Sequence, residues 1–471
     1  MKILVAIANY GTRNDRYLSQ VLDQFRRLPH QVQLVVTSNL AKNIAADVEV
    51  IPGLPTKDPW SLPFAHKRVF ADRLDFHDLF VYTEDDVLIG AQNISGFLRA
   101  SEILAENELP GFLRSEIDSQ GRVYFPDVHS HFHWDAGSVT RRGDHVFAHF
   151  TNLHSACYAL TQSQLRRAIR SGGFLVPPHQ GDYDTLVTAA TDPYTQCGFR
   201  KLLCISHVEE FIVSHLPNRY VGQPLRGGEL SLCAEDFHAQ LRALLSLSKN
   251  GKPKATLFPV ETNVRYRRWS KSYYESCQEE AIALLPEGAK SVLSIGCGWG
   301  ATEARLVERG IKVKALPIDP VIAASAQSRG IEIIFADAQA ACRQLAGERF
   351  DCLLILNVLH LVRDPVRFLA SFLPFCPEGS VIASVPNVSK LRRLFRRIQF
   401  RSRDANPQNY QTHGMHVTNR SVIQRWLRQA GLRPVKTGYQ VSDKHKAADR
   451  RSLGLARGTL AETCSILAYR A

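Results

Sequence analysis

Residues 291–300 read SVLSIGCGWG, and this stretch decides the fold of the second half of the chain. It begins as a short apolar run, typical of a buried strand, and ends with glycines at positions 296, 298 and 300. A helical pattern follows at 301–309. Glycines permit a sharp turn and let a ligand lie against bare backbone, and the start of a helix adds oriented N–H groups. A strand, a glycine turn and a helix in this order therefore predict a nucleoside-like ligand in an α/β sheet.

Further strand-like runs follow the glycine turn and end in polar residues. The expected strands are 313–318, 331–335, 350–356 and 381–385. Their alternation with helical patterns fits parallel strands joined by crossover helices. Asp319 ends the first run, ~20 residues past the glycines, where such folds hold a ribose hydroxyl pair. Asp337-Ala338 and Asn357 end the next two runs, and acidic residues at successive strand ends make the signal stronger than the glycines alone.

The glycine turn with Asp319 and Asp337 resembles a class I S-adenosylmethionine-dependent methyltransferase over residues 270–471. The resemblance implies a Rossmann-like seven-stranded sheet, with S-adenosylmethionine as cofactor. It assigns the cofactor-binding residues by motif: Gly296, Gly298 and Gly300 at the methionine end, Asp319 at the ribose, Asp337 and Ala338 at the adenine, and Asn357 beside the methyl donor. A dinucleotide-binding domain fits less well, because its last two glycines stand three apart.

One position departs from this family. Ser294 stands where an Asp or Glu usually orients the glycine loop or the amino group of the donor, so a domain without catalytic activity is the alternative. Methyl transfer is an in-line displacement, and the enzyme mainly positions donor and acceptor. A hydroxyl acceptor would benefit from a general base. His360 is the first candidate, and His413 and His416 are the alternatives.

The first half opens as a strand, a helix and a strand over residues 2–37, which predicts a second α/β sheet. An apolar run at 79–83 leads directly into Glu84-Asp85-Asp86. Successive carboxylates beside a strand repel one another, and burial would raise their pKa values. A divalent cation such as magnesium or manganese would remove that cost, because both prefer oxygen ligands. The alternative is a polar turn that closes a hairpin.

Residues 1–245 resemble a GT-A-type glycosyltransferase, with Tyr82-Thr83-Glu84-Asp85-Asp86 in the place of its acidic DxD-like motif. In that family the motif binds a divalent cation, which holds the diphosphate of a nucleotide-sugar. The resemblance implies metal ligands at Asp86 and Glu84, with His215 as a further ligand. The residues that it places against the nucleotide-sugar are Asn9, Tyr10, Arg13, Lys67 and Asp85.

Inverting sugar transfer needs a general base that takes a proton from the acceptor hydroxyl. In the GT-A fold the base lies well downstream of the acidic motif. The resemblance therefore admits Asp182, Asp184, Glu209 and Glu210, and we take the first two as the catalytic candidates.

Histidines are frequent between residues 124 and 154. Those at 129, 131 and 133 alternate, so on a strand they would share one face. A merely solvated strand is the first interpretation. A polar acceptor groove, with Trp134 as a surface on which a sugar stacks, is the main alternative, and a zinc site is the less favoured one.

The polar run at 249–254 lies between the two segments that resemble these families. We therefore expect a GT-A-like domain at 1–248, a linker at 249–272 and a methyltransferase domain at 273–471. The net charge of +13 favours anionic partners such as nucleotides, nucleic acid or a membrane surface. None of the ten cysteines forms a Cys-x-x-Cys pair, which favours a reducing cytoplasm over a disulfide framework. The opening MKILVAIANYG is expected to be a strand and not a signal peptide.

The stretch 390–403 reads KLRRLFRRIQFRSR, with apolar residues on one helix face and arginines on the rest. Such a helix would either lie on an anionic membrane surface or cover the acceptor site. Nucleic acid is the less favoured partner, because no known RNA- or DNA-binding module accompanies the charge. No apolar run approaches the ~18 residues needed to cross a bilayer. We expect a cytoplasmic protein, peripheral to the inner face of the membrane at most.

These expectations combine into a bifunctional enzyme. One half would transfer a sugar from a nucleotide-sugar to a glycan or glycolipid acceptor, and the other would methylate a glycan at oxygen with S-adenosylmethionine. In the first alternative, the chain is a methyltransferase whose first half only binds a glycan. In the second, it modifies RNA, which salt-sensitive RNA binding would reveal.

Overall fold

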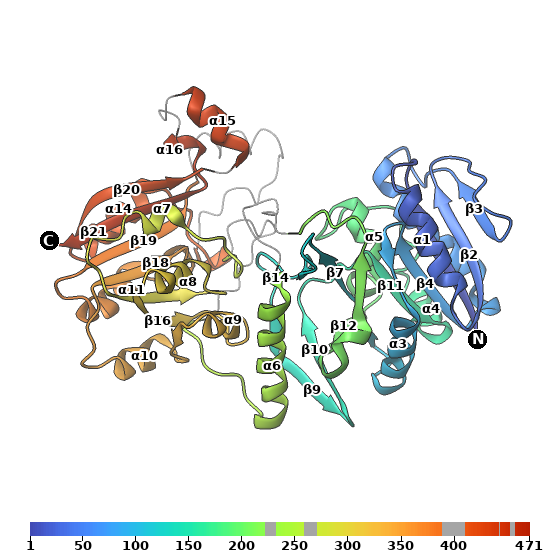
Figure 1. The fold of residues 1–471 in the computed structure, drawn as a ribbon, viewed down its shortest axis with the longest axis horizontal. Helices are drawn as coiled ribbons and strands as arrows, with labels where there is room; N and C mark the ends of the chain where they lie inside the picture. The colour runs from blue at the N-terminus through green and yellow to red at the C-terminus, as the bar shows by residue number, and fades with distance from the viewer. Residues whose placement is uncertain (222–231, 259–270, 389–409, 442, 453–456) are drawn as a thin grey trace.

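The computed structural model describes residues 1–221, 232–258, 271–388, 410–441, 443–452 and 457–471. It has two α/β halves, with helix α6 (Ala234–Asn250) at the junction between them (Figure 1). The predicted amphipathic helix at 390–403 lies outside the described residues, as does the part of the predicted linker at 259–270. None of the described helices is long and apolar enough to cross a membrane.

The elements follow one another along the chain as strands alternating with helices and short 3-10 turns. Those of the first half are β1 (Lys2–Asn9), α1 (Asp15–Arg26), β2 (Gln31–Ser38), β3 (Val48–Pro52), η1 (Pro59–Phe64), α2 (Ala65–Asp72), η2 (Leu74–Phe76), β4 (Leu79–Glu84), β5 (Val87–Leu88), α3 (Ala91–Ile103), β6 (Glu108–Pro110), β7 (Leu113–Ile117), β8 (Val123–Phe125), β9 (Trp134–Arg142), β10 (His145–Phe150), β11 (Cys157–Thr161), α4 (Gln162–Arg170), α5 (Thr185–Thr195), β12 (Arg200–Cys204), η3 (Ile205–Phe211), β13 (Ile212–His215), β14 (Leu232–Cys233) and α6. Those of the second half are α7 (Glu279–Ile282), β15 (Ser291–Cys297), α8 (Ala301–Glu308), β16 (Lys312–Pro317), α9 (Ala323–Ser328), β17 (Glu332–Ile333), α10 (Ala338–Gln344), β18 (Cys352–Leu356), η5 (Leu359–Leu361), α11 (Pro365–Phe372), η6 (Leu373–Phe375), β19 (Ser380–Pro386), α13 (Tyr410–His413), α14 (Arg420–Gln429), β20 (Leu432–Gln440), α15 (Asp443–Arg451), α16 (Arg457–Leu460) and β21 (Thr463–Arg470).

A five-stranded sheet in the order β11-β4-β1-β2-β3 forms the base of the first half. β1 pairs in parallel with β2 and β4, and β11 is an antiparallel edge strand. The apolar runs of β1 and β4 are buried, as a largely parallel sheet with covered faces requires. Ala8 lies opposite Glu84 in this pairing, so the end of β1 meets the start of the acidic triplet.

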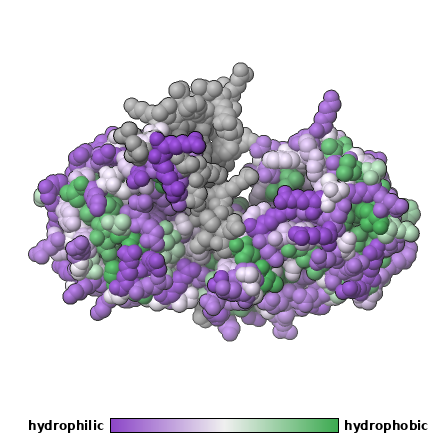
Figure 2. All heavy atoms as spheres, turned by 45° about the horizontal axis from the view of Figure 1, so that its top comes forward, coloured by the Kyte–Doolittle hydropathy of each residue, from purple (hydrophilic) through white to green (hydrophobic). Residues whose placement is uncertain are grey.

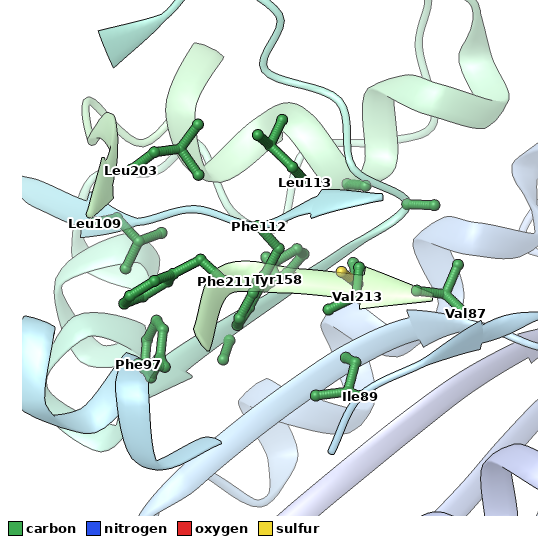
Figure 3. Close-up of a cluster of buried hydrophobic side chains, with 14 of the residues drawn as sticks. Val87, Ile89, Phe97, Leu109, Phe112, Leu113, Tyr158, Leu203, Phe211 and Val213 are labelled. Atoms are coloured by element: carbon green, nitrogen blue, oxygen red, sulfur yellow. The ribbon is translucent and has the colours of Figure 1, made fainter. Parts of the chain in front are cut away.

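Two smaller sheets complete the first half, in the orders β6-β12-β10-β9 and β14-β8-β7-β13-β5. The pairing of β13 with β5 sets His215 opposite Val87, next to the acidic triplet in sequence. Aromatic rings pack between helix α3 and these sheets (Figure 3). The Phe112 ring centroid lies 6.2 Å from that of Phe97 and 6.4 Å from that of Phe211. This core fixes the position of β13 and hence of His215.

The second half is built on a seven-stranded sheet in the order β17-β16-β15-β18-β19-β21-β20. β21 runs antiparallel to β19 and β20, and the other pairs are parallel. The predicted Rossmann-like seven-stranded sheet is therefore confirmed. The order turns back at β15, which has β16 on one side and β18 on the other, and α/β sheets bind ligands at such a switch point. The edge strand β17 is shorter than expected, at Glu332–Ile333, and pairs only with β16.

The two halves share a packed junction. Several residues of the second half belong to the same buried cluster as the core of the first, among them Tyr273, Tyr274, Trp299, Val321 and Ile322. Helix α6 of the first half packs on α9 of the second, and the side-chain amide of Gln240 donates to the Ser325 hydroxyl at 3.0 Å. Beside it, Arg329 forms an ion pair with the buried Asp236. On the face seen in Figure 2, hydrophilic side chains predominate and apolar ones lie in small groups.

Candidate functional site

The glycine turn after β15 is shaped by the close approach of other segments. Gly296 and Gly300 have φ values of 91° and 83°, which only glycine adopts readily. A Cβ atom on Gly298 would lie 2.3 Å from the carbonyl oxygen of Tyr273, and one on Gly296 would lie 2.1 Å from Cγ2 of Val358. These contacts exclude a larger residue at either position. Glycine is therefore required here by the close packing of Tyr273 and Val358, and a ligand that lies against this backbone stays a prediction.

A pocket lies against this turn, and the backbone of Tyr273 closes one side of it. The Tyr273 carbonyl oxygen accepts the N–H of Trp299 at 3.0 Å, and the Tyr273 N–H donates to the carbonyl oxygen of Ser130 at 2.7 Å. Ser130 belongs to the first half of the chain. One side of the pocket is therefore held in place by both halves.

A carboxylate that the sequence analysis missed lies in the same pocket. The Ser294 hydroxyl donates a hydrogen bond to Oε1 of Glu303 at 2.6 Å, and both side chains are buried. Glu303 is in the first turn of α8, three residues after Gly300. The acidic group absent from position 294 is thus supplied from the helix. An acidic residue just after the third glycine was the available signal.

Asp319 and Asp337 lie beyond the carboxyl ends of the neighbouring strands β16 and β17. Oδ1 of Asp319 accepts two backbone N–H groups, from Val321 and Ile322, at 2.8 and 2.7 Å. Asp337 accepts a backbone N–H as the N-cap of α10. Burial raises the pKa of Asp319. Both carboxylates stand at the predicted edge of the sheet and are oriented by backbone, whereas their contacts with ribose and adenine, like that of Ala338, remain predictions.

Asn357 and His360 follow β18 on the other side of the turn. Asn357 has a φ of 49°, in the left-handed region, and its N–H donates to the carbonyl oxygen of Ser384 at 3.0 Å. The His360 side chain is 0% exposed, because η5 packs against β19. A general base must reach the acceptor hydroxyl. The burial of His360 therefore departs from the predicted catalytic role.

An ion pair beside the turn was also missed, because these residues fell within or next to the predicted linker. Lys271 Nζ lies 3.1 Å from Oε1 of Glu275 and donates to the carbonyl oxygen of Leu356 at 2.8 Å. Burial raises the pKa of Glu275, although Lys271 opposes this shift. The pair ties the segment before α7 to the end of β18. Its only signal in the sequence is the spacing of a lysine and a glutamate four residues apart.

The acidic triplet of the first half lies at the end of β4 in a buried polar cluster. Oδ2 of Asp86 is 3.7 Å from Nε2 of His215, and Nδ1 of His215 is 2.5 Å from Oε1 of Glu116. Oε1 of Glu84 and Oδ1 of Asp86 are buried without a hydrogen-bond partner among the described residues. Burial raises the pKa of Glu84 to about 8. Burial also opposes ionisation of Asp86, but His215 together with the charges of Arg219 and Arg114 outweighs it, and the pKa of that carboxyl is lowered.

Asp85, the remaining residue of the triplet, accepts hydrogen bonds from other side chains of the protein. The side-chain amide of Asn9 donates to Oδ2 of Asp85, and that of Asn14 donates to Oδ1, both at 2.7 Å. Asn9 and Asp85 thus lie together as predicted, but they bond to each other. Tyr10 is 52% exposed and Arg13 is also exposed, so these two side chains lie open to solvent just after β1.

Lys67 does not fit its predicted role. It is 2% exposed and forms an ion pair with the buried Asp192, so its ammonium group is not available to a donor phosphate. Asp184 is the N-cap of α5, where Oδ1 accepts the N–H of Val187 at 3.0 Å. Asp182 and Asp184 are both exposed, and their catalytic role stays a prediction.

The histidine-rich stretch differs from its predicted structure. β9 begins at Trp134, and residues 129–133 form turn and coil, so the prediction that three histidines share a strand face is wrong. Trp134 is 1% exposed and cannot stack on a sugar. The ring of His133 lies 5.2 Å from that of Tyr273. This stretch is therefore part of the junction between the halves.

Comparison with known proteins finds similarity in the second half. Residues 265–437 match a family model described as a methyltransferase domain. A ubiquinone biosynthesis O-methyltransferase of Cereibacter sphaeroides is 34% identical over 110 residues, which cover 22% of this chain and 44% of that protein. The protein of the same name from Ruegeria pomeroyi is 27% identical over 175 residues, which cover 32% of this chain and 62% of that protein. The chain spans about half the length of the curated relatives it matches.

Similarity to solved structures is low. A SAM-dependent methyltransferase from Archaeoglobus fulgidus has a TM-score of 0.31 and 17% identity, over 41% of this chain and 90% of that one. The family match and the strand order together place a Rossmann-like methyltransferase domain in the second half.

Proposed function

We propose that the chain is an S-adenosylmethionine-dependent methyltransferase that acts on a hydroxyl group. The observation that carries this proposal is the glycine turn at the switch point of the sheet, with the buried carboxylate of Glu303 beside it. The methyltransferase match at 265–437 supports it, and relatives named O-methyltransferases support an oxygen acceptor. When bound, the donor supplies an activated methyl group on a positively charged sulfur atom.

The residues at this pocket fit such a donor. Tyr273 and Val358 pack closely against the glycine turn, and the Glu303 carboxylate beside it favours a cationic amino group. Asp319 would hold the ribose hydroxyls, and Asp337 with Ala338 would hold the adenine. The work of the chain is then to align donor and acceptor, since positioning is the main contribution that an enzyme makes to this displacement.

The experiment is calorimetric titration of the full chain with S-adenosylhomocysteine. We expect Asp319→Ala to weaken binding by about tenfold or more, because hydrogen bonds to a charged group contribute roughly 1.5–3 kcal/mol. Glu378→Gln, which changes an exposed acid of the same domain, should bind like the unaltered chain. An unaltered chain that binds no S-adenosylhomocysteine would contradict the proposal.

We also propose that the first half transfers a sugar from a nucleotide-sugar, with manganese or magnesium held by Asp86, Glu84 and His215. The supporting observation is the pair of buried carboxylate oxygen atoms that lack hydrogen-bond partners beside this histidine. Carboxylate oxygen atoms suit such a cation. When bound, the cation would neutralise the donor diphosphate. Arg219 lies 3.6 Å from Asp86 and adds positive charge for the phosphates.

The two activities would act on one glycan or glycolipid, with methylation of the added sugar or of its neighbour. The packed junction between the halves supports this coupling, because it keeps both sites on one body. The alternative is a methyltransferase whose first half binds a glycan without sugar transfer.

Thermal unfolding of the full chain separates these two possibilities. Manganese with uridine or guanosine diphosphate should raise the melting temperature, because a ligand bound only by the folded state stabilises it. Asp86→Asn should abolish this shift, whereas Asp23→Asn, on the exposed side of α1, should keep it. No shift in the unaltered chain would favour the glycan-binding alternative. Sugar transfer that survives Asp86→Ala would contradict the metal assignment.

A further inference from the structure

A group of soft metal-binding side chains lies in the first half, away from the acidic triplet. His145 begins β10, Cys204 ends β12, and His207 follows within η3. One potential ligand atom from each of the three residues lies within 4.8 Å of the other two. Among the described residues, this is the one group of three His, Cys, Asp or Glu side chains that lie this close together. Neither proposed activity uses it.

The local fold brings these side chains together. β10 pairs with β12, so the strand that begins at His145 runs beside the strand that ends at Cys204. Cys204 and His207 are three residues apart, so one short segment carries two of the three side chains. η3 is interrupted at His207, where φ is −134° and ψ is 43°. Because of this kink, Nδ1 of His207 lies 3.9 Å from Sγ of Cys204.

The distances suit a four-coordinate ion with small adjustments. Zinc–sulfur and zinc–nitrogen bonds of ~2.3 and ~2.1 Å leave neighbouring tetrahedral ligands ~3.5 Å apart. The His145 and His207 ring centroids are 4.7 Å apart. His207 is exposed and His145 is half-buried, so either ring can rotate. In this structure Nδ1 of His207 lies 2.9 Å from Oγ of Ser206, within hydrogen-bond distance.

The donor set selects the metal. One thiolate and two imidazoles suit zinc, whereas manganese and magnesium prefer carboxylates, carbonyls and water. Cys204 is buried, and the exposed His207 leaves a side open to water as a fourth ligand. We propose that His145, Cys204 and His207 bind one zinc ion, which cross-links the β9–β10 hairpin to η3.

The function of this ion would be structural. η3 leads directly into β13, which carries His215 to the acidic triplet. An ion that fixes η3 against β10 would stabilise this connection. The binding of metal to the folded state contributes to the stability of the fold.

The experiment is a zinc titration of the untagged full chain in competition with a chromophoric chelator, after chelator dialysis. We expect one tightly bound equivalent and a rise in melting temperature when zinc is restored. His207→Gln, at an exposed position, should lose that equivalent without unfolding the protein, and Cys204→Ser should lose it as well. His30→Gln and Cys342→Ser, which change half-buried residues outside the group, should retain it.

Cobalt gives a second measurement that depends on the thiolate. The cobalt-loaded chain should absorb in the near ultraviolet through sulfur-to-metal charge transfer, and Cys204→Ser should lose this band. Asp86→Asn should keep both the zinc equivalent and the cobalt band, which separates this site from the one proposed for sugar transfer. The zinc site is overturned if the unaltered chain binds no zinc, or if His207→Gln binds zinc as the unaltered chain does.

Discussion

Oγ of Ser294 and Oε1 of Glu303 lie 2.6 Å apart in the buried pocket beside the glycine turn. The strand therefore contributes a hydroxyl group, and the following helix contributes the carboxylate. This arrangement provides an acidic group beside the turn although the strand lacks one. The serine at position 294 therefore does not by itself imply a loss of donor binding.

Glu303→Ala should weaken the binding of S-adenosylhomocysteine by about tenfold, close to 1.4 kcal/mol, because a charged hydrogen-bond acceptor beside the donor is lost. The double variant Ser294→Asp with Glu303→Ser returns a carboxylate to the strand and should recover most of the affinity. Calorimetry measures both. Glu308→Ala, at an exposed position of α8, is the matched control. Equal affinity of Glu303→Ala and the unaltered chain would contradict the role of this carboxylate.

Gly298→Ala should abolish donor binding and lower the melting temperature. The added Cβ would lie 2.3 Å from the carbonyl oxygen of Tyr273 and 3.0 Å from its carbon atom, so the backbone at Tyr273 must move. Gly458→Ala is the control, because the nearest atom there is 3.5 Å away. Thermal unfolding with and without S-adenosylhomocysteine measures the effect. A Gly298→Ala variant that still binds would show that the Tyr273 segment is not part of the pocket.

Arg329→Met should destabilise the chain by about 3 kcal/mol, because it leaves the carboxylate of Asp236 buried without its partner. The double variant Arg329→Met with Asp236→Leu should recover much of this loss, since it removes both charges from the junction. Melting temperatures of the two single variants and the double variant give the coupling energy. Additive effects would mean that the pair does not hold α6 against α9.

Stability should rise with pH above 8 through Lys201. Burial lowers the pKa of Lys201 from 10.5 to about 8. Between these values the unfolded chain binds more protons than the folded one, so the free energy of unfolding increases with pH. The full gain is ~3 kcal/mol, from 1.36 kcal/mol for each pKa unit. It is absent below pH 8 and complete near 10.5.

Lys201→Met should remove this pH dependence, because methionine does not titrate. Melting temperatures of both proteins at intervals from pH 7.5 to 10 measure the difference. Lys290→Met, an exposed lysine of the second half, is the control and should keep the slope of the unaltered chain. Parallel curves for the unaltered chain and Lys201→Met would contradict a lowered pKa.

The second half could be predicted well because its information is local. Strand 291–295, the glycines and the acidic strand ends each depend on a short stretch, and the order of a parallel sheet then follows from a few topological rules. Glu303 was not predicted because the family pattern places the acidic residue on the strand, at position 294. In space the helix start reaches the same pocket, since the turn folds it back beside Ser294.

In the first half, the errors concern partners far apart in sequence. The sequence predicts Lys67 as a phosphate contact, but its partner Asp192, 125 residues later, neutralises its charge. The alternating histidines have the period of a strand, but residues 129–133 are held in a turn at the junction, where Ser130 contacts Tyr273. The zinc ligands were likewise hidden, because His145 joins Cys204 only through the pairing of β10 with β12. Periodicity cannot report such contacts.

The backbone of Tyr273 has a consequence for how such a chain can change over generations. The peptide segment at Tyr273 is hydrogen-bonded on one side to Ser130 and on the other to Trp299, so the first half supports the glycine turn of the second. A deletion of the first half would also remove a hydrogen bond that holds this turn in the second half. Gene fission between the halves would therefore weaken the glycine turn of the second half.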